Sequence, residues 1–157
     1  MSVTPSIPIL ELTAENFAPY GTLLEPKANA TIERGDITYW HAQADLSGLE
    51  NDGVLSFLHA FEREPILEDI ERHLHTPEAF IPLEGESLMV FGPPGDLDLS
   101  SLRAFKLDHT RAVLLHAGTW HWAPYPITPT SSFVLILRQS TVPDDVHVIP
   151  IAPHRIG

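Results

Sequence analysis

Short apolar runs separated by Gly, Pro and other turn-forming residues dominate the chain. Runs of this kind predict β-strands, and the residues between them predict turns. So many short strands predict an all-β fold, either a sandwich or a closed barrel. The expected strands cover residues 7–12, 21–25, 37–42, 54–61, 72–75, 79–83, 86–91, 103–107, 112–116 and 132–138.

Only a few short helices are expected between these strands. Thr13 is expected to cap a helix over residues 14–17. Residues 65–71 fit either one helical turn or the entrance of a strand, and residues 28–35 are expected to form a loop. Because the chain has no repeat, linker or low-complexity segment, residues 1–157 are expected to form a single domain.

The charge balance narrows the range of partners. The chain has 21 acidic and 9 basic side chains, which give a net charge of −12 when histidine is neutral. Such a chain repels the phosphates of nucleic acids and of anionic lipids, so neither is an expected partner. An anionic substrate would need a local cation, supplied by a metal ion or a buried arginine. The lack of cysteine excludes disulfides, thiolate zinc sites and a cysteine nucleophile.

The sequence also suggests a compartment. Residues 1–10 have neither the basic region nor the long apolar run of a signal peptide, and no segment has the length of a membrane span. The expected location is therefore the cytoplasm.

Histidines supply the candidate chemistry, and the chain has nine of them. His73 and His75 lie two residues apart on a predicted strand, so their rings are expected on one face of it. Glu78 follows a short turn and is expected to rejoin this face, while Gly118 allows the turn that precedes His121. Two or three imidazoles with one carboxylate suit a divalent metal ion and leave coordination positions open for a substrate.

The spacing of these residues resembles the two-part sequence signature of cupins, which are small jelly-roll barrels with a site inside the barrel mouth. The resemblance implies that His73, His75, Glu78 and His121 are metal ligands. The chain departs from the signature in three ways, one of which is that the trailing asparagine of the second motif is absent. Its first motif is one or two residues shorter before Glu78, and His116 stands where the second motif usually has proline.

Nearly the whole chain resembles the ureidoglycolate lyase family. The family implies a homodimer of cupin barrels that splits ureidoglycolate into glyoxylate and urea during allantoin and purine breakdown. Family members often lack a histidine at position 75 and carry Gln at position 78, so this chain has a fuller ligand set. The resemblance is carried by residues 70–73, 79–83 with Gly85, 98–105, His116 with Trp120 and His121, and Phe17, Pro19, Tyr20 and Gly21.

The expected reaction and the positions of individual residues suggest their roles. The expected metal is a divalent ion such as Ni, Mn, Zn or Fe. His116 and His121 are the expected catalytic residues, with His116 carrying the proton. Arg138 is expected either to bind a substrate carboxylate at the barrel mouth or to end its strand in solvent. Trp120 is expected either to shape the pocket or to form part of the barrel wall.

Two other functions fit the same pattern. One is another metal-dependent cupin enzyme, such as a sugar-acid isomerase or a dioxygenase. The other is a non-catalytic cupin that binds a small carboxylate. Bound iron with oxygen consumption would favour a dioxygenase. A sensor of this class usually carries a DNA-binding domain, and this chain has neither the room nor the charge for one.

Overall fold

Nearly all regular structure in the computed structural model, which describes residues 3–157, is β. The larger sheet has the order β1 (Ser6–Ile7), β15 (His147–Ile156), β7 (Ile66–Arg72), β12 (Trp120–His121), β9 (Ser87–Gly92), β10 (Arg103–Leu107) and β2 (Ile9–Leu10), with β13 (Tyr125–Pro126) beside β9. The five-stranded sheet has the order β3 (Gly21–Leu24), β11 (Ala112–Leu115), β8 (Glu78–Glu84), β14 (Thr130–Arg138) and β6 (Gly53–Phe61). Strands β4 (Ile32–Glu33) and β5 (Thr38–Tyr39) form a separate hairpin. The helices are α1 (Ala14–Phe17), α2 (Thr141–Asp144) and the 3-10 turns η1 (Ser47–Leu49) and η2 (Leu99–Ser101).

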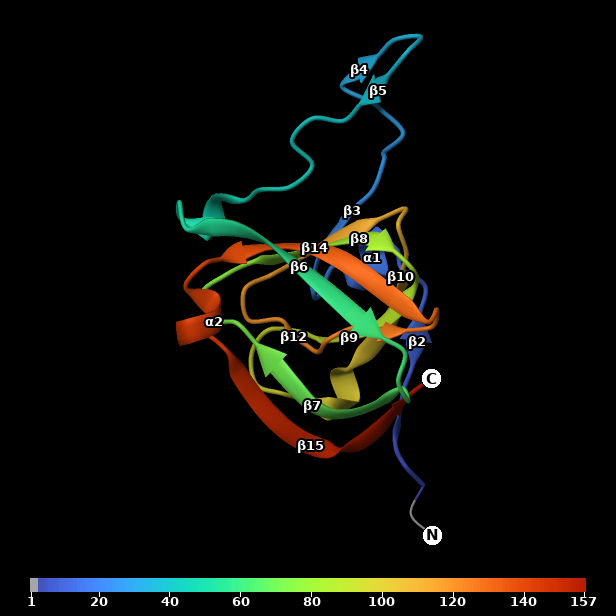
Figure 1. Ribbon diagram of the computed structural model, residues 1–157, viewed down its shortest axis with the longest axis vertical. Helices are drawn as coiled ribbons and strands as arrows, with labels where there is room; N and C mark the ends of the chain where they lie inside the picture. The colour runs from blue at the N-terminus through green and yellow to red at the C-terminus, as the bar shows by residue number, and fades with distance from the viewer. Residues whose placement is uncertain (1–2) are drawn as a thin grey trace.

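The two larger sheets face each other and nearly close a barrel (Figure 1). From β7 to β9 the chain passes from the larger sheet to the five-stranded sheet and back, and it repeats this exchange from β11 to β15. Passage between two packed sheets in this manner is typical of a jelly roll. The predicted all-β barrel with a few short helices is therefore confirmed.

The main apolar core lies between the sheets, and a second apolar cluster lies on the other face of the larger sheet. Along β14, Phe133, Leu135 and Leu137 point inward and are buried, while their neighbours are only half-buried. This period of two is the one expected for a strand with one buried face. Phe17 of α1 packs edge-on against Phe91, with ring centroids 5.2 Å apart, and so fills one end of the barrel.

The chain bends after β7, so the strand predicted over residues 72–75 is not formed. Residues 66–72 form the strand instead, which settles the ambiguity over residues 65–71 in favour of a strand. Residues 73–75 turn away because the backbone N–H groups of Leu74 and His75 donate to the side chain of Asp145 rather than to a neighbouring strand. His73 is buried, whereas His75 is exposed. The prediction that the two rings share one face of a strand is wrong.

Three other predictions also need correction. The strand expected over residues 7–12 is two short strands that Pro8 separates. Residues 25–46 form an arm with the β4–β5 hairpin, so the expected strand over residues 37–42 shrinks to β5 and the expected loop over residues 28–35 contains β4 (Figure 1). Strand β15 was not expected at all. By contrast, the helix over residues 14–17 is confirmed, and Thr13 Oγ1 accepts a hydrogen bond from Asn16 N at 3.1 Å.

No helix among residues 3–157 combines the length and the apolar character needed to cross a bilayer.

Candidate functional site

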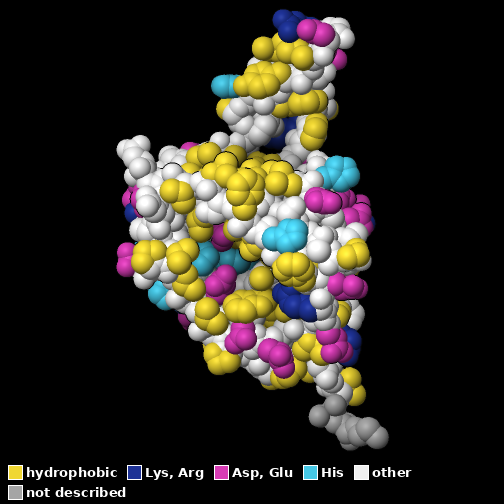
Figure 2. Space-filling model, in the orientation of Figure 1, with side chains coloured by type: hydrophobic (Ala, Val, Ile, Leu, Met, Phe, Trp, Pro, Cys, Tyr) yellow, Lys and Arg dark blue, Asp and Glu magenta, His cyan; other side chains and the backbone are white. Residues whose placement is uncertain are grey.

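A cavity of about 270 Å³ opens between β6, β7 and the segment around α2. Most of its wall is apolar. Figure 2 shows histidine and acidic side chains at the bottom of a hollow in the surface. The apolar wall consists of Leu58, Phe80, Leu135, Leu137, Val142 and Val146, and the titratable groups are Glu71, His73, Glu78 and His121.

Two backbone carbonyls orient the two histidines of this cavity. His73 Nδ1 lies 2.8 Å from Asp145 O, and His121 Nδ1 lies 2.9 Å from Thr119 O. A carbonyl oxygen only accepts hydrogen bonds, so each Nδ1 must carry a proton. The Nε2 atoms are therefore the ones that meet the Glu78 carboxylate, in the arrangement by which proteins commonly orient histidine ligands of metals.

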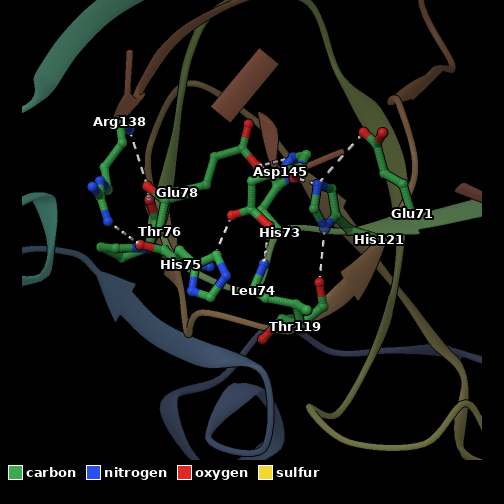
Figure 3. A network of polar contacts seen from close by, with 11 residues as sticks. Glu71, His73, Leu74, His75, Thr76, Glu78, Thr119, His121, Arg138 and Asp145 are labelled. Carbon is green, nitrogen blue, oxygen red and sulfur yellow. Dashed lines mark hydrogen bonds and ion pairs between the residues drawn. The ribbon is translucent and has the colours of Figure 1, made fainter. Parts of the chain in front are cut away.

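The Glu78 side chain points toward both histidines (Figure 3). Its Oε2 is 3.4 Å from His73 Nε2 and 3.1 Å from His121 Nε2, and the residue is only 5% exposed. Glu78 Oε2 and His121 Nε2 are both buried without an aligned hydrogen bond. A second carboxylate, Glu71, lies nearer the solvent, with its Oε1 3.7 Å from His121 Nε2.

The charges of this group are strongly coupled. Burial alone lowers the pKa of His73, but the Glu78 carboxylate outweighs burial and raises that pKa to about 9. Burial alone raises the pKa of Glu78, but His121 and His73 together lower it to about 2. In the metal-free protein at neutral pH, a protonated His73 thus faces an ionised Glu78.

This group fits a metal ion. Glu71, His73 and His121 each offer one ligand atom, and these atoms lie within 4.8 Å of one another. The unpartnered Glu78 Oε2 and His121 Nε2 supply further lone pairs at the same place. Imidazole and carboxylate ligands together suit Zn, Mn, Fe or Ni.

His75 does not join this group. Its side chain is exposed, and it is absent from the cavity lining. Its backbone instead stabilises the bend after β7 through two hydrogen bonds. His75 N donates to Asp145 Oδ2 at 2.8 Å, and its carbonyl accepts from Arg138 at 3.1 Å.

His116 also lies apart from the cavity. It is exposed and lines a different surface depression, together with Thr22 and Asp45. Its Nε2 lies 3.3 Å from Ala18 O. The structure therefore brings together His73, Glu78 and His121 but not His116.

Arg138 and Trp120 lie outside the cavity lining too. Arg138 lies 3.3 Å from Glu50 and 3.5 Å from Asp52, so nearby carboxylates already neutralise it. Trp120 is buried on the opposite face of β12 from His121, in an apolar cluster with Ile70 and Val90. Its Nε1 donates to Gly95 O. The guanidinium of Arg72 lies 4.4 Å from the Trp120 ring centroid.

Sequence reasoning missed Glu71 and Asp145. Glu71 lies two residues before His73, near the end of β7, and it pairs in register with His121 of β12. The alternation used for residues 73 and 75 would have found it if applied to residues 71 and 73. Asp145 meets His73 only through the fold, since 72 positions separate them.

Sequence comparisons with known proteins agree on one family. The family model described as ureidoglycolate lyase matches residues 4–155. The ureidoglycolate lyase of Escherichia coli (strain SMS-3-5) is 31% identical over 149 residues, covering 90% of this chain and 93% of that protein. The ureidoglycolate lyase of Salmonella typhimurium (strain LT2) is 28% identical with the same coverage. Among solved structures, RmlC from Streptococcus suis in complex with dTDP-D-xylose has a TM-score of 0.47 and 5% identity, covering 57% of this chain and 45% of that one.

Proposed function

Since the chain belongs to the ureidoglycolate lyase family, we propose that it splits ureidoglycolate into glyoxylate and urea in the cavity that holds His73, Glu78 and His121. We place this reaction in the cytoplasm, as a step of allantoin breakdown. The relatives named above carry the same activity in their names and align with nine-tenths of the chain.

The charged side chains of the cavity favour a bound metal ion. Among residues 3–157, those that line it include two carboxylates but neither lysine nor arginine. The protonated His73 is already paired with Glu78, so a carboxylate substrate would meet the second carboxylate, Glu71, unless a cation entered with it. We therefore propose that His73, His121 and Glu78 bind a divalent ion, namely Ni, Mn, Zn or Fe. Glu78 rather than Glu71 is the proposed carboxylate ligand, because Glu78 Oε2 is buried without a partner beside both histidines whereas Glu71 lies nearer the solvent.

When bound, this ion supplies positive charge that polarises the hydroxyl and carboxylate oxygens of the substrate. The protein supplies the proton transfers. The hydroxyl proton must leave as the carbon–nitrogen bond breaks, and the departing urea nitrogen must gain a proton. The electrons of the O–H bond form the new carbonyl, so one proton moves from oxygen to nitrogen and the reaction balances.

We propose Glu71 as the carrier of that proton. It lies beside His121 at the edge of the group, and its side chain is 24% exposed, compared with 6% for Glu78. Glu78 is committed to the two histidines, with a pKa of about 2, and stays ionised. The apolar wall formed by Leu58, Leu135 and their neighbours keeps bulk water away from the reacting atoms.

The direct test is an assay on ureidoglycolate. The purified protein is treated with chelator, then resupplied separately with Mn, Ni, Zn or Fe. Urea and glyoxylate are measured against the spontaneous decay of the substrate. Product formed above that decay, and only with metal, supports the proposal. Catalysis that is equally fast after chelation would reject the metal role, and no catalysis with any metal would reject the lyase function.

We further propose that the active form is a homodimer. The outer face of the five-stranded sheet is apolar at its edge, where Leu55, Phe57 and Phe61 of β6 are 61%, 78% and 65% exposed. Val134 of β14 lies in register between Phe57 and Ile81, so the apolar surface continues inward across the sheet. Monomers rarely leave patches of this kind in water.

The arm over residues 25–46 also supports a dimer. It leaves the five-stranded sheet after β3, returns before β6 and projects away from the barrel, with hydrophobic side chains gathered at its base (Figures 1 and 2). Ile32, Ile37 and Tyr39 on the arm are each 44% exposed. A second copy related by a twofold axis would bring an apolar sheet face and an arm to the same place, so that each copy covers the surface of the other.

A further inference from the structure

The segment that follows α2 joins the cavity wall to a candidate metal ligand. Thr141 and Val146 line the cavity, and between them Asp145 is buried at 4% exposure. Asp145 N donates to Thr141 O at 2.8 Å, which ties Asp145 to the short helix.

The Asp145 carboxylate fastens the bend after β7. Its Oδ1 accepts from Leu74 N at 2.9 Å, and its Oδ2 accepts from His75 N at 2.8 Å (Figure 3). His147 Nε2 lies 3.0 Å from the same Oδ1. Hydrogen bonds to a charged acceptor are stronger than those between neutral groups, so the bend is held firmly against Asp145.

These hydrogen bonds bring the main-chain carbonyl oxygen of Asp145 within 2.8 Å of His73 Nδ1. A free imidazole can carry its proton on either nitrogen. The carbonyl requires a proton on Nδ1, which leaves Nε2 as the ligand atom facing Glu78 and His121. One residue thus controls both where the ring lies and which nitrogen can bind a metal.

We infer that Asp145 is the positioning residue of His73. Its carboxylate fixes the bend of residues 73–75, and its carbonyl aims His73 Nε2 at the metal-binding group. This inference rests on the proposed function for its purpose, because it assigns Asp145 to the metal site of that function.

The experiment compares Asp145→Ala and Asp145→Asn with a matched control, Asp144→Ala, at the exposed neighbouring position. Zn²⁺ binding is measured by calorimetry on the full chain. The buried His73 Nδ1 proton is followed by NMR in the metal-free protein. Circular dichroism and thermal melts report the fold.

Loss of the residue that orients a histidine ligand typically weakens metal binding about ten- to a hundredfold. We expect that loss in Asp145→Ala, together with fast exchange of the His73 Nδ1 proton. Asp145→Asn keeps one acceptor oxygen, so its Zn²⁺ affinity and proton exchange rate should lie between those of Asp145→Ala and the wild type. Asp144→Ala should have the wild-type values of both. If Asp145→Ala does not fold, Asp145→Asn, which has nearly the same shape, carries the comparison.

Wild-type Zn²⁺ affinity and a protected Nδ1 proton in a folded Asp145 variant would overturn the inference. A purely structural role would lower the melting temperature and leave both of these readouts unchanged, and so would overturn it as well. Failure of the lyase function is distinguishable, because it would abolish product formation in the wild type while the NMR comparison still reports on Asp145.

Discussion

At the scale of single residues, a proton and a metal ion compete for His73 Nε2. In the metal-free protein this nitrogen faces Glu78 Oε2 at 3.4 Å, and the pKa of His73 is raised to about 9. A metal binds only the deprotonated nitrogen, so binding must release that proton below pH 9.

Metal affinity should therefore depend on pH in a defined direction. Below pH 9 the protonated form of His73 dominates, so the apparent affinity for Mn²⁺ should fall roughly tenfold for each pH unit from pH 8.5 to pH 6.5. Calorimetry in buffers with different ionisation enthalpies measures both the affinity and the proton released. His116→Gln, altered outside the cavity, should show the wild-type slope. A pH-independent affinity would contradict the protonation of His73.

The two carboxylates of the cavity should respond differently to the same change. Glu78→Gln removes a buried ligand and should abolish tight metal binding. Glu71→Gln should keep the metal and reduce turnover about 10²- to 10⁴-fold, the usual worth of a general acid–base group. Metal content by mass spectrometry and steady-state kinetics separate the two effects.

His116→Gln is the comparison for Glu71→Gln, because His116 was the proton carrier expected from the sequence. It should retain nearly all wild-type turnover. A strong loss of turnover in His116→Gln, with full turnover in Glu71→Gln, would make His116 rather than Glu71 the proton carrier.

At the scale of elements, the sequence located most strands but not the point at which β7 ends. Apolar runs predicted β10 and β6 well, because each run lies between turns. Strand β15 escaped prediction because Pro150 and Pro153 interrupt it, and its register shifts between Pro150 and His154. The candidate site was found in part. His73, Glu78 and His121 meet, but the bend that excludes His75 depends on Asp145, a contact that local patterns do not contain.

The β8–β9 turn gives an element-scale prediction. Gly85 has φ +77°, and a Cβ there would lie 2.3 Å from Thr130 O, a backbone atom that cannot move aside freely. Gly85→Ala should reduce the free energy of unfolding by at least about 2 kcal/mol. Gly95 is the control, because its φ of +112° is also positive but its Cβ would meet nothing within 4 Å. Urea denaturation should show a clearly smaller loss for Gly95→Ala, and equal losses would remove the steric argument.

At the scale of the whole molecule, the barrel presents two unlike outer faces. The five-stranded sheet exposes large apolar side chains along β6, and the arm rises beside it. The opposite sheet has the short strands β1 and β2 at its two edges. An isologous dimer through the first face would cover the apolar surface and leave each cavity with its own complete group of side chains.

The prediction is that Phe57→Glu yields a folded monomer. Phe57 is 78% exposed, so the substitution removes no core contact, but it places a charge at the centre of the proposed interface. Light scattering coupled to size exclusion measures the mass. Val148→Glu, which alters an exposed residue of β15, should leave the dimer intact. A wild-type protein that is monomeric at micromolar concentration, or a dimeric Phe57→Glu, would place the interface elsewhere or remove it.

The absence of lysine and arginine from the cavity lining, among the described residues, also bears on inhibitor design. A polyanionic compound would have to overcome Glu71 and Glu78, whereas a small neutral chelating group would not. The apolar wall of Leu58, Leu135 and Leu137 would accept a short hydrocarbon tail on such a compound. Selectivity would then come from the fit of that tail, because the chelating head would be shared with inhibitors of many other metalloenzymes.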